Sequence, residues 1–241
     1  VRQARLHIVE FRGFERFIQG RPYWELPMVV QRLCGICPVS HHLAAGKAID
    51  MLVGAKQLTP TADKTRRLLH YGQVLQSHAL HFFHLASPDL IFGDSVDPRK
   101  RNIINILKKH PETALKGVKL RKFGQQIIEL ISGKRVHGSL VLPGGINQQL
   151  NSGDIQYLKN QLQSVLPWCR SAVELAKKIY LSDDSHHHFA RVCSPLLSMV
   201  NPQGGFELYH GGLRATTATG ETIFDQLDYC RYDEHILEEV K

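Results

Sequence analysis

The 241-residue sequence predicts an α+β, helix-dominated fold, in which a core bundle of long helices carries short peripheral β-strands or hairpins. Apolar residues recur at three- and four-residue steps through most of the chain, which is the helical period. Short β-type runs are confined to regions near the two ends of the sequence. No repeat or linker divides the chain, so we expect residues 1–241 to form a single partial domain.

The first elements expected are a strand and a helix, separated by a stretch rich in glycine and proline. Residues 3–12 alternate loosely between apolar and polar side chains, which predicts the strand. Residues 40–55 have apolar positions at helical spacing. A longer helix then has Pro60 just inside its start and Thr59 or Thr61 as its cap, because threonine is favoured at the cap and proline in the first turn.

Proline and glycine mark where the later helices end. Ser87-Pro88 should stop the long helix, because the residue before a proline is disfavoured in helical conformation. Gly133 should close a later helix, and Pro167 should kink or divide the last one. The turn-rich segment 137–147 is expected to be a connector. The remaining elements are expected, in chain order, as helices at 101–115, 118–131 and 154–180, short β-type runs at 206–226 and the opening of a helix at 232–241.

Composition excludes several classes of protein. No apolar run approaches the roughly 20 residues that a membrane-spanning helix needs, and the first residues lack the apolar segment of a secretion signal. Lys and Arg outnumber Asp and Glu by 30 to 22, but they are scattered and not interleaved with aromatic residues, so a nucleic-acid-binding module is the weakest hypothesis. An acidic partner or simple solvation explains the charge equally well. Five cysteines with one close pair favour reduced thiols in the cytoplasm.

The strongest chemical signal is the segment RLCGICPVSH at residues 32–41. Cys34 and Cys37 are three apart, so both sulfurs can face one metal ion, and Gly35 allows the tight turn between them. A helix that begins three residues after the pair would direct its amide dipole toward the sulfurs and favour thiolates. His41 can reach back to hydrogen-bond a bound sulfur, and such donors tune a metal thiolate.

The cysteine pair has three weaker interpretations. A thioredoxin-type redox pair would need a preceding strand in a βαβ setting, which the pattern lacks. A structural zinc site would need a second Cys/His pair at zinc-finger spacing, and none follows. A chance pair of core cysteines fits poorly with Arg32, Gly35 and His41 around it. A soft metal held by thiolates is therefore the preferred hypothesis.

The pattern RxCGxCxxxH resembles the first metal motif of the large subunit of nickel–iron hydrogenases, and further stretches agree in the right order. Residues 12–15, RGFE, are similar to the family's RGxE motif, and residues 137–145 are similar to its HxxxxxPGG motif. The segment HALHFFHLASPDL at 78–90 is similar to the family's long central helix. The segments VEFRGFERF and IFDQ look most like those of the cytoplasmic, NAD-linked branch of the family. The resemblance spans almost the whole chain.

The resemblance implies a role for each matching residue. Cys34 would be a terminal thiolate on nickel, Cys37 a thiolate bridging nickel and iron, and His41 a hydrogen-bond partner of the bridging sulfur. Glu15 would be the proton gate, and partial desolvation beside a buried metal thiolate would suit a carboxylate to that relay. A surface helix-cap or salt-bridge residue is the alternative interpretation of Glu15. Arg32 could pair with a carboxylate, cover the anionic thiolates or be purely structural.

The implied cofactor is a nickel–iron centre whose iron carries carbon monoxide and cyanide. Reversible heterolytic cleavage of H2 needs a soft Lewis acid and a neighbouring base for the proton. The electrons would leave through an iron–sulfur cluster on a separate small subunit, because this chain lacks the cysteines to hold one. NAD-linked diaphorase subunits would then receive them. The implied protein is a cytoplasmic hetero-oligomer.

The main departure from the family is the absence of its second metal motif, DPCxxCxxH. Cys34 and Cys37 supply only half of a four-thiolate site. We therefore expect roughly the N-terminal half of a large subunit, which alone should not turn over hydrogen. Deazaflavin-linked or other cytoplasmic hydrogenases are near alternatives. A non-catalytic relative, similar to the quinone-site subunit of respiratory complex I, is the alternative from another class, and the intact cysteines argue against it.

The remaining residues with metal-binding chemistry have simpler interpretations. His78, His81 and His84 follow at three-residue steps beside two phenylalanines, and we expect packed or subunit-facing histidines rather than metal ligands. Cys169 lies next to Trp168 on a predicted helix and is expected in the core.

Overall fold

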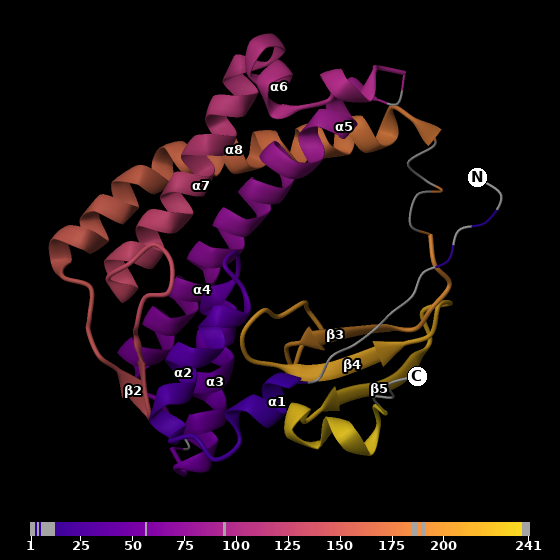
Figure 1. Ribbon diagram of the computed structural model, residues 1–241. Helices are drawn as coiled ribbons and strands as arrows, with labels where there is room; N and C mark the ends of the chain where they lie inside the picture. Colours follow the sequence, from indigo (N-terminus) through magenta and orange to yellow (C-terminus); the bar gives the residue numbers. More distant parts are fainter. Residues whose placement is uncertain are drawn as a thin grey trace. The chain divides into compact units, whose positions relative to one another are not determined.

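The computed structural model divides the chain into two compact units and describes residues 3, 5, 13–55, 57–93, 95–184, 188 and 191–237. One unit contains Val1–Gly20 and Phe189–Lys241, and the other contains Arg21–His188. Helices dominate the second unit and a small sheet lies in the first, so the predicted helix-dominated α+β fold is confirmed (Figure 1). The strand expected at residues 3–12 lies outside the described residues, apart from residues 3 and 5, which are in no strand.

The α-helices are α1 Gly13–Ile18, α2 Leu26–Val29, α3 Pro38–Leu52, α4 Pro60–Leu80, α5 Ser87–Phe92, α6 Ile103–Lys109, α7 Pro111–Ser132 and α8 Ser152–Leu181. Short 3-10 turns are η1 Tyr23–Glu25, η2 Val30–Leu33, η4 Pro98–Lys100 and η6 Tyr229–Glu234, and η3 His81–Ala86 is a π-helical turn. The strands are β1 Val141–Leu142, β2 Gly145–Ile146, β3 Leu196–Val200, β4 Gly212–Thr216 and β5 Thr222–Leu227.

Helices α4 and α7 pack side by side at the centre of the second unit (Figure 1). Two glycines make their close approach possible. A Cβ atom on Gly72 would lie 2.7 Å from the side chain of Ile127, and one on Gly124 would lie 2.6 Å from the backbone oxygen of Gly72. Leu69 and Leu120 are almost fully buried in the same core. Any larger residue at either glycine would push the two helices apart.

The long central helix begins as predicted and continues further than predicted. Thr59 caps α4 by accepting the N–H of Ala62 at 3.3 Å. The expected end at Ser87-Pro88 is wrong, because the chain passes through η3 directly into α5. Pro88 then lies in the first turn of α5, where its missing N–H is tolerated. The Ser87 hydroxyl donates to the carbonyl of Phe83 at 2.7 Å and supports this junction.

Among the later helices, α8 matches its predicted span closely, whereas the helix expected at 101–115 is divided between α6 and the start of α7, which begins earlier than the expected 118. Gly133, with φ 78°, ends α7 as predicted. Pro167 does not divide α8, which is one continuous helix. Pro167 and Gln163 are exposed, so water can satisfy the carbonyl that the missing proline N–H leaves unpaired. The helix expected at 232–241 is wrong for its described part: residues 232–234 belong to η6, residues 235–237 are not helical, and the rest lies outside the described residues.

Both sheets are small and antiparallel. Strands β1 and β2 form a hairpin inside the segment expected to be a connector, with Leu142 opposite Gly145. The sheet of the first unit has the order β3-β4-β5. Strands β4 and β5 match the β-type runs predicted at 206–226, whereas β3 was not predicted. The guanidinium of Arg214 on β4 joins the carboxylate of Asp225 on β5 at 2.7 and 2.9 Å.

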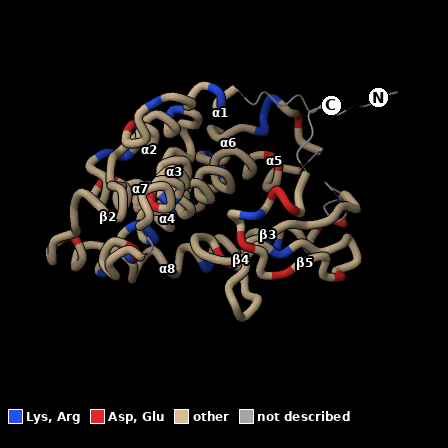
Figure 2. Tube along the Cα trace, turned by 90° about the horizontal axis from the view of Figure 1, so that it is seen from below, with Lys and Arg blue, Asp and Glu red and all other residues tan. Residues whose placement is uncertain are grey.

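The distribution of charge agrees with the sequence analysis. Figure 2 shows Lys and Arg in short groups on many segments, interrupted by acidic and neutral residues. No helix in the described part of the chain combines the length and the apolar character that crossing a bilayer requires.

Candidate metal centre

The two cysteines of the predicted motif lie in the segment Cys34–Cys37, here called the ligand loop, between η2 and α3. The backbone N–H groups of Ile36 and Cys37 donate to the Cys34 sulfur at 3.4 and 3.3 Å. The sulfurs of Cys34 and Cys37 and a ring nitrogen of His41 all lie within 4.8 Å of one another. Elsewhere among the described residues, no group of three or more such side chains is close enough to hold an ion.

The two thiols differ in their electrostatic surroundings. A hydrogen bond from the Cys37 thiol, reinforced by the N–H groups of Cys37 and Ile36, lowers the pKa of Cys34. Burial, then the hydrogen bond and charge of Cys34, raises the pKa of Cys37 to about 11. The Cys34 sulfur is therefore the more readily ionised of the two.

Helix α3 begins at the second cysteine and brings His41 back to it. Cys37 is the N-cap residue of α3, and the His41 Nε2 atom lies 3.7 Å from the Cys37 sulfur. This is the contact that the four-residue spacing predicts. The turn between the cysteines does not depend on glycine at position 35, because its φ is not positive and a Cβ atom there would meet no heavy atom within 4 Å.

Two glutamines on α4 contact the ligand loop and the start of α3. The Gln76 side chain donates to the backbone oxygen of Ile36 at 2.9 Å. The Gln73 amide oxygen accepts the N–H of Ser40 at 3.0 Å, and its nitrogen donates to the Ser40 hydroxyl at 2.5 Å. Both glutamines are buried: 4% of the surface of Gln73 and 7% of the surface of Gln76 are exposed. Helix α4 therefore supports the ligand loop through polar contacts.

A buried histidine connects α3 to the segment before the β1–β2 hairpin. The Nδ1 atom of His42 bonds the carbonyl of Pro27 at 2.8 Å, and Nε2 accepts the N–H groups of Leu140 and Val141 at 3.1 and 3.0 Å. These partners require a neutral ring with its proton on Nδ1. Burial lowers the pKa of His42 and favours this neutral form. The hydrogen bond to Pro27 opposes the shift, and the charge of Arg66 assists it.

An ion pair between α3 and α4 holds the PGG turn of that hairpin. Arg66 is fully buried and bonds Asp50 at 2.5 Å. The same guanidinium donates to the carbonyls of Leu142 and Gly145 at 3.0 and 2.7 Å. The Asp50 carboxylate accepts the N–H of Gly144 at 2.7 Å. The charges are thus paired and also hydrogen-bonded to backbone, as burial requires.

The remaining two predicted site residues are not part of this cluster. Arg32 is exposed on η2, and within the described residues it makes no ion pair with a carboxylate. Its positive charge, after burial, helps to lower the pKa of His137. Glu15 is exposed on α1 and belongs to the other compact unit. Its role as a proton gate and the role of Arg32 both stay predictions.

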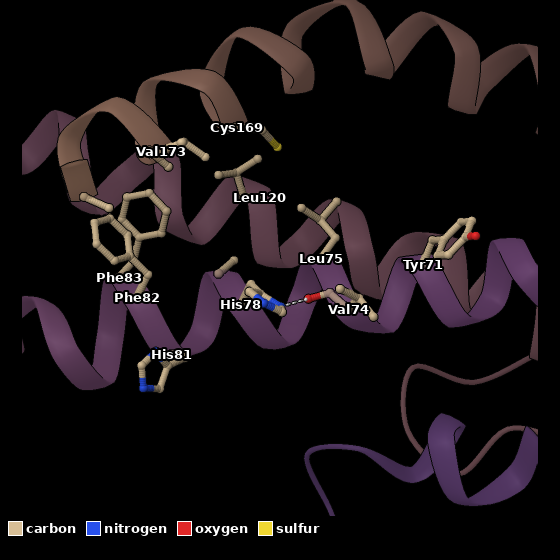
Figure 3. A pocket seen from close by; sticks show the side chains of 13 residues that line it. Tyr71, Val74, Leu75, His78, His81, Phe82, Phe83, Leu120, Cys169 and Val173 are labelled. Carbon is tan, nitrogen blue, oxygen red and sulfur yellow. Dashed lines mark hydrogen bonds between the residues drawn. The ribbon is translucent and has the colours of Figure 1, made fainter. Parts of the chain in front are cut away.

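An apolar cavity of about 520 Å³ in the second unit is lined by residues of α4, η3, α7 and α8. In Figure 3, Phe82, Leu120 and Val173 gather around it. His78 is exposed and donates to the carbonyl of its own helix at Val74, 2.9 Å away. Cys169 is half-buried against the cavity rather than in the core, and burial raises its pKa. His81 and His84 lie in the π-helical turn η3, so the three histidines do not follow one regular α-helical face.

The sequence analysis missed the buried polar residues that support the ligand loop and the β1–β2 hairpin. Arg66, Gln73 and Gln76 lie at three- and four-residue steps from the buried Leu69 and are buried with it. A polar side chain in register with an apolar stripe signals a buried hydrogen-bond network, because burial requires a partner. That signal was present in the sequence, although it does not name the partner.

The donor set fits the centre that the resemblance implies. Two thiolates suit soft divalent metals such as nickel, and they lie at a helix N-terminus, where the dipole favours negative charge. Cys34 and Cys37 are half of the four thiolates expected. The other half is not in this sequence.

Comparison with known proteins agrees with this site. The model of the nickel-dependent hydrogenase family matches residues 12–114. The chain is 40% identical over 250 residues to the NAD-reducing hydrogenase HoxS subunit beta of Cupriavidus necator, a match that covers 99% of this chain and 51% of that protein. It is 42% identical over 178 residues to a subunit of the F420-non-reducing hydrogenase vhu of Methanocaldococcus jannaschii, covering 74% of this chain and 42% of that protein.

A solved structure of a hydrogenase is also similar to this chain. The crystal structure of an NAD+-reducing NiFe-hydrogenase in the H2-reduced state matches with a TM-score of 0.92 and 49% identity, over 98% of this chain and 53% of that one. The chain thus spans about half the length of the relatives that it matches. With the paired thiols at the start of α3, these similarities show that the chain belongs to the nickel-dependent hydrogenase family.

Proposed function

We propose that this chain is part of the large subunit of a nickel–iron hydrogenase, which cleaves H2 reversibly and passes the electrons to NAD through partner subunits. The observation that carries the proposal is the convergence of Cys34, Cys37 and His41 within 4.8 Å at the N-terminus of α3. The relative from Cupriavidus necator, aligned over 99% of this chain, is named an NAD-reducing hydrogenase. The non-catalytic alternative is not favoured, because it gives no reason to keep the thiols.

When bound, the nickel–iron centre, with carbon monoxide and cyanide on its iron, supplies the Lewis acid for heterolytic cleavage of H2. Cys34 would hold nickel as a terminal ligand, and Cys37 would bridge the two metals. His41, 3.7 Å from the Cys37 sulfur, would donate a hydrogen bond to it and stabilise the thiolate. Arg32 would add positive charge beside the anionic centre.

The chain's own residues would also move the proton. A cysteine thiolate would act as the base that accepts it. Glu15, an exposed carboxylate on α1, would take the proton from that sulfur and deliver it to solvent.

The proposed assembly is a cytoplasmic hetero-oligomer. A small subunit with an iron–sulfur cluster would take the electrons, and diaphorase subunits would pass them to NAD. Both compact units would belong to one partial domain, since the match to the Cupriavidus necator protein covers 99% of this chain. The second thiolate pair would come from sequence beyond this chain, so the 241 residues alone would not turn over hydrogen.

The nickel content of the assembled enzyme tests the proposal. Cys34→Ser and Cys37→Ser should each remove most of the nickel, because a hydroxyl is a poor ligand for a soft metal. Metal analysis of the purified complex measures this loss. Cys193→Ser and Cys230→Ser, at exposed positions of the other unit, are matched controls and should keep the nickel. Full nickel content in both ligand-loop variants would contradict the proposal.

A further inference from the structure

Helix α3 begins without the side-chain cap that a helix of its length commonly has. Its N-cap residue is Cys37, and no hydrogen bond from the Cys37 side chain caps the helix. The usual N-cap residue is Ser, Thr, Asp or Asn, whose oxygen accepts the N–H of the second or third helical residue. A cysteine that serves as a metal ligand cannot do this, because its sulfur is directed to the metal.

Gln73 of α4 supplies the missing acceptor from another helix. Ser40 is the third residue of α3, and its N–H is donated to the Gln73 amide oxygen at 3.0 Å. That N–H is shared with the carbonyl of Cys37 at 3.1 Å. The other end of the Gln73 amide donates to the Ser40 hydroxyl. The start of α3 is therefore satisfied while the Cys37 sulfur stays available.

Gln76 fixes the ligand loop one turn further along α4. Its amide nitrogen donates to the carbonyl of Ile36, the residue directly before Cys37, at 2.9 Å. The same peptide group carries the N–H of Cys37, which donates to the Cys34 sulfur at 3.3 Å. One peptide segment thus connects the glutamine to both cysteines. Rotating that segment would redirect the N–H that the Cys34 sulfur accepts.

The part of α4 that carries the two glutamines is buried and closely packed. Gln73 and Gln76 are buried, and Gly72 and Gly124 let α7 pack directly against this part of α4. A Cβ atom on Gly124 would lie 2.7 Å from the Cβ atom of Gln76. Close packing against α7 therefore leaves the Gln76 side chain little room to adopt other rotamers.

We infer that Gln73 and Gln76 are positioning residues of the metal centre: Gln73 caps α3 in place of Cys37, and Gln76 sets the orientation of the Ile36 peptide between the two ligands. This inference rests on the proposed function, because it takes Cys34 and Cys37 as metal ligands. Outer partners of metal ligands commonly change metal affinity about 10- to 100-fold when they are removed. The two glutamines have different roles. Gln73 must accept a hydrogen bond from the backbone N–H of Ser40, whereas Gln76 must donate one to the carbonyl of Ile36.

That difference gives a test in which one substitution has opposite results at two positions. Gln73→Glu keeps an acceptor for the Ser40 N–H and hydroxyl, so metal binding should stay close to that of the unchanged chain. Gln76→Glu places an acceptor against the Ile36 carbonyl, so affinity should fall about 10- to 100-fold. Gln125→Glu, on the α7 side of a small cavity that Gln76 and Ile36 also line, adds the same charge and should have little effect. Gln73→Met removes the cap and should weaken binding several-fold.

The readout is titration of the reduced, metal-free full chain with Co²⁺ under anaerobic conditions, followed by the thiolate-to-cobalt charge-transfer absorption. The unchanged chain should give this absorption, and Gln76→Glu should shift the band as well as weaken binding. Circular dichroism of each metal-free variant reports folding. If Gln76→Glu does not fold, Gln76→Met, which lacks the donor without adding charge, should show the same loss of affinity.

The outcomes separate the two levels of the argument. No thiolate–cobalt absorption from the unchanged chain would overturn the ligand assignment, and the positioning role with it. Normal absorption with equal affinities for the Gln73→Glu and Gln76→Glu chains would overturn the positioning role alone. A loss at Gln125→Glu as large as at Gln76→Glu would also overturn it, because charge rather than hydrogen-bond geometry would then be the cause.

Discussion

Two long helices of the second unit, α4 and α8, differ in how many of their residues are buried. Helix α4 has 21 residues and buries eight of them, including Thr65, Arg66, Gln73 and Gln76. Helix α8 has 30 residues and buries only Val165 among those described. Apolar residues of α8 such as Leu166 and Val173 are about half exposed. Helix α4 therefore forms part of the buried core and supports the site, whereas α8 is longer but buries little surface.

The contrast shows what an amphipathic pattern does and does not determine. Both helices have apolar residues at helical spacing, and both were predicted from the sequence. The pattern specifies which face of a helix is apolar. It does not specify how much of that face another element covers, nor which polar residues are buried with it. Both properties come from packing partners far away in the sequence.

The largest expected effect tests whether α4 depends on its buried polar contacts. Arg66→Leu should reduce the free energy of unfolding by about 3–5 kcal/mol, because it leaves Asp50 as an uncompensated buried charge and the hairpin carbonyls without a donor. Urea unfolding measures the change. Arg67→Leu is the matched control on the same helix, since Arg67 pairs with Asp63 where both are part-exposed, and should lose about 0.2–1 kcal/mol. Equal losses would remove the distinction between buried and surface pairs.

A second effect concerns the histidine that joins α3 to the segment before β1. The native pKa of His42 is lowered, chiefly by burial, from an ordinary value of 6.5, so the unfolded chain binds a proton more readily than the native protein does. Stability from this group is complete above pH 6.5 and is lost as the pH falls from 6.5 toward the native pKa. Urea unfolding on either side of pH 6.5 measures the loss. His42→Gln should flatten the dependence, and His78→Gln, at an exposed position, should leave it unchanged. A fall just as steep in His42→Gln would assign the effect to other groups.

The smallest expected effect lies on α8. Leu166→Ala should change the free energy of unfolding by less than about 0.5 kcal/mol, because 48% of this side chain is already exposed. The same substitution on α4, Leu69→Ala, removes a fully buried side chain and should lower it by about 2–5 kcal/mol. Thermal or urea unfolding of the two variants compares the helices directly. A loss at Leu166 that approaches the loss at Leu69 would show that α8 contributes as much to stability as α4.

Sequence reasoning succeeded where the determining physics is local. The cap at Thr59, the end of α7 at Gly133 and the return of His41 to Cys37 all depend on residues within a few positions of one another. The helix end expected at Pro88 was wrong because a π-helical turn let a new helix begin there. The local rule for proline was correct, but it does not state whether a helix stops or restarts.

The missed features depend on distant partners. Gln76 and Ile36 are 40 positions apart, and Arg66 and Gly145 are 79 apart. No local pattern specifies such pairs. Likewise, strand β3 forms because β4 lies beside it, and its own sequence, LLSMV, lacks a clear alternation. The motif residues could be predicted, whereas the framework that orients them required the structure.

The ion pair between Asp50 and Arg66 also bears on how the protein reaches its native state. Because it binds backbone groups of residues 142–145, it joins three segments, and closing the chain between Arg66 and Leu142 spans 76 positions. Loop closure of that size loses entropy before its contacts form. Both charges must stay hydrated until the hairpin arrives. The hairpin should therefore dock late in folding, after α3, α4 and α7 have assembled the surface that receives it.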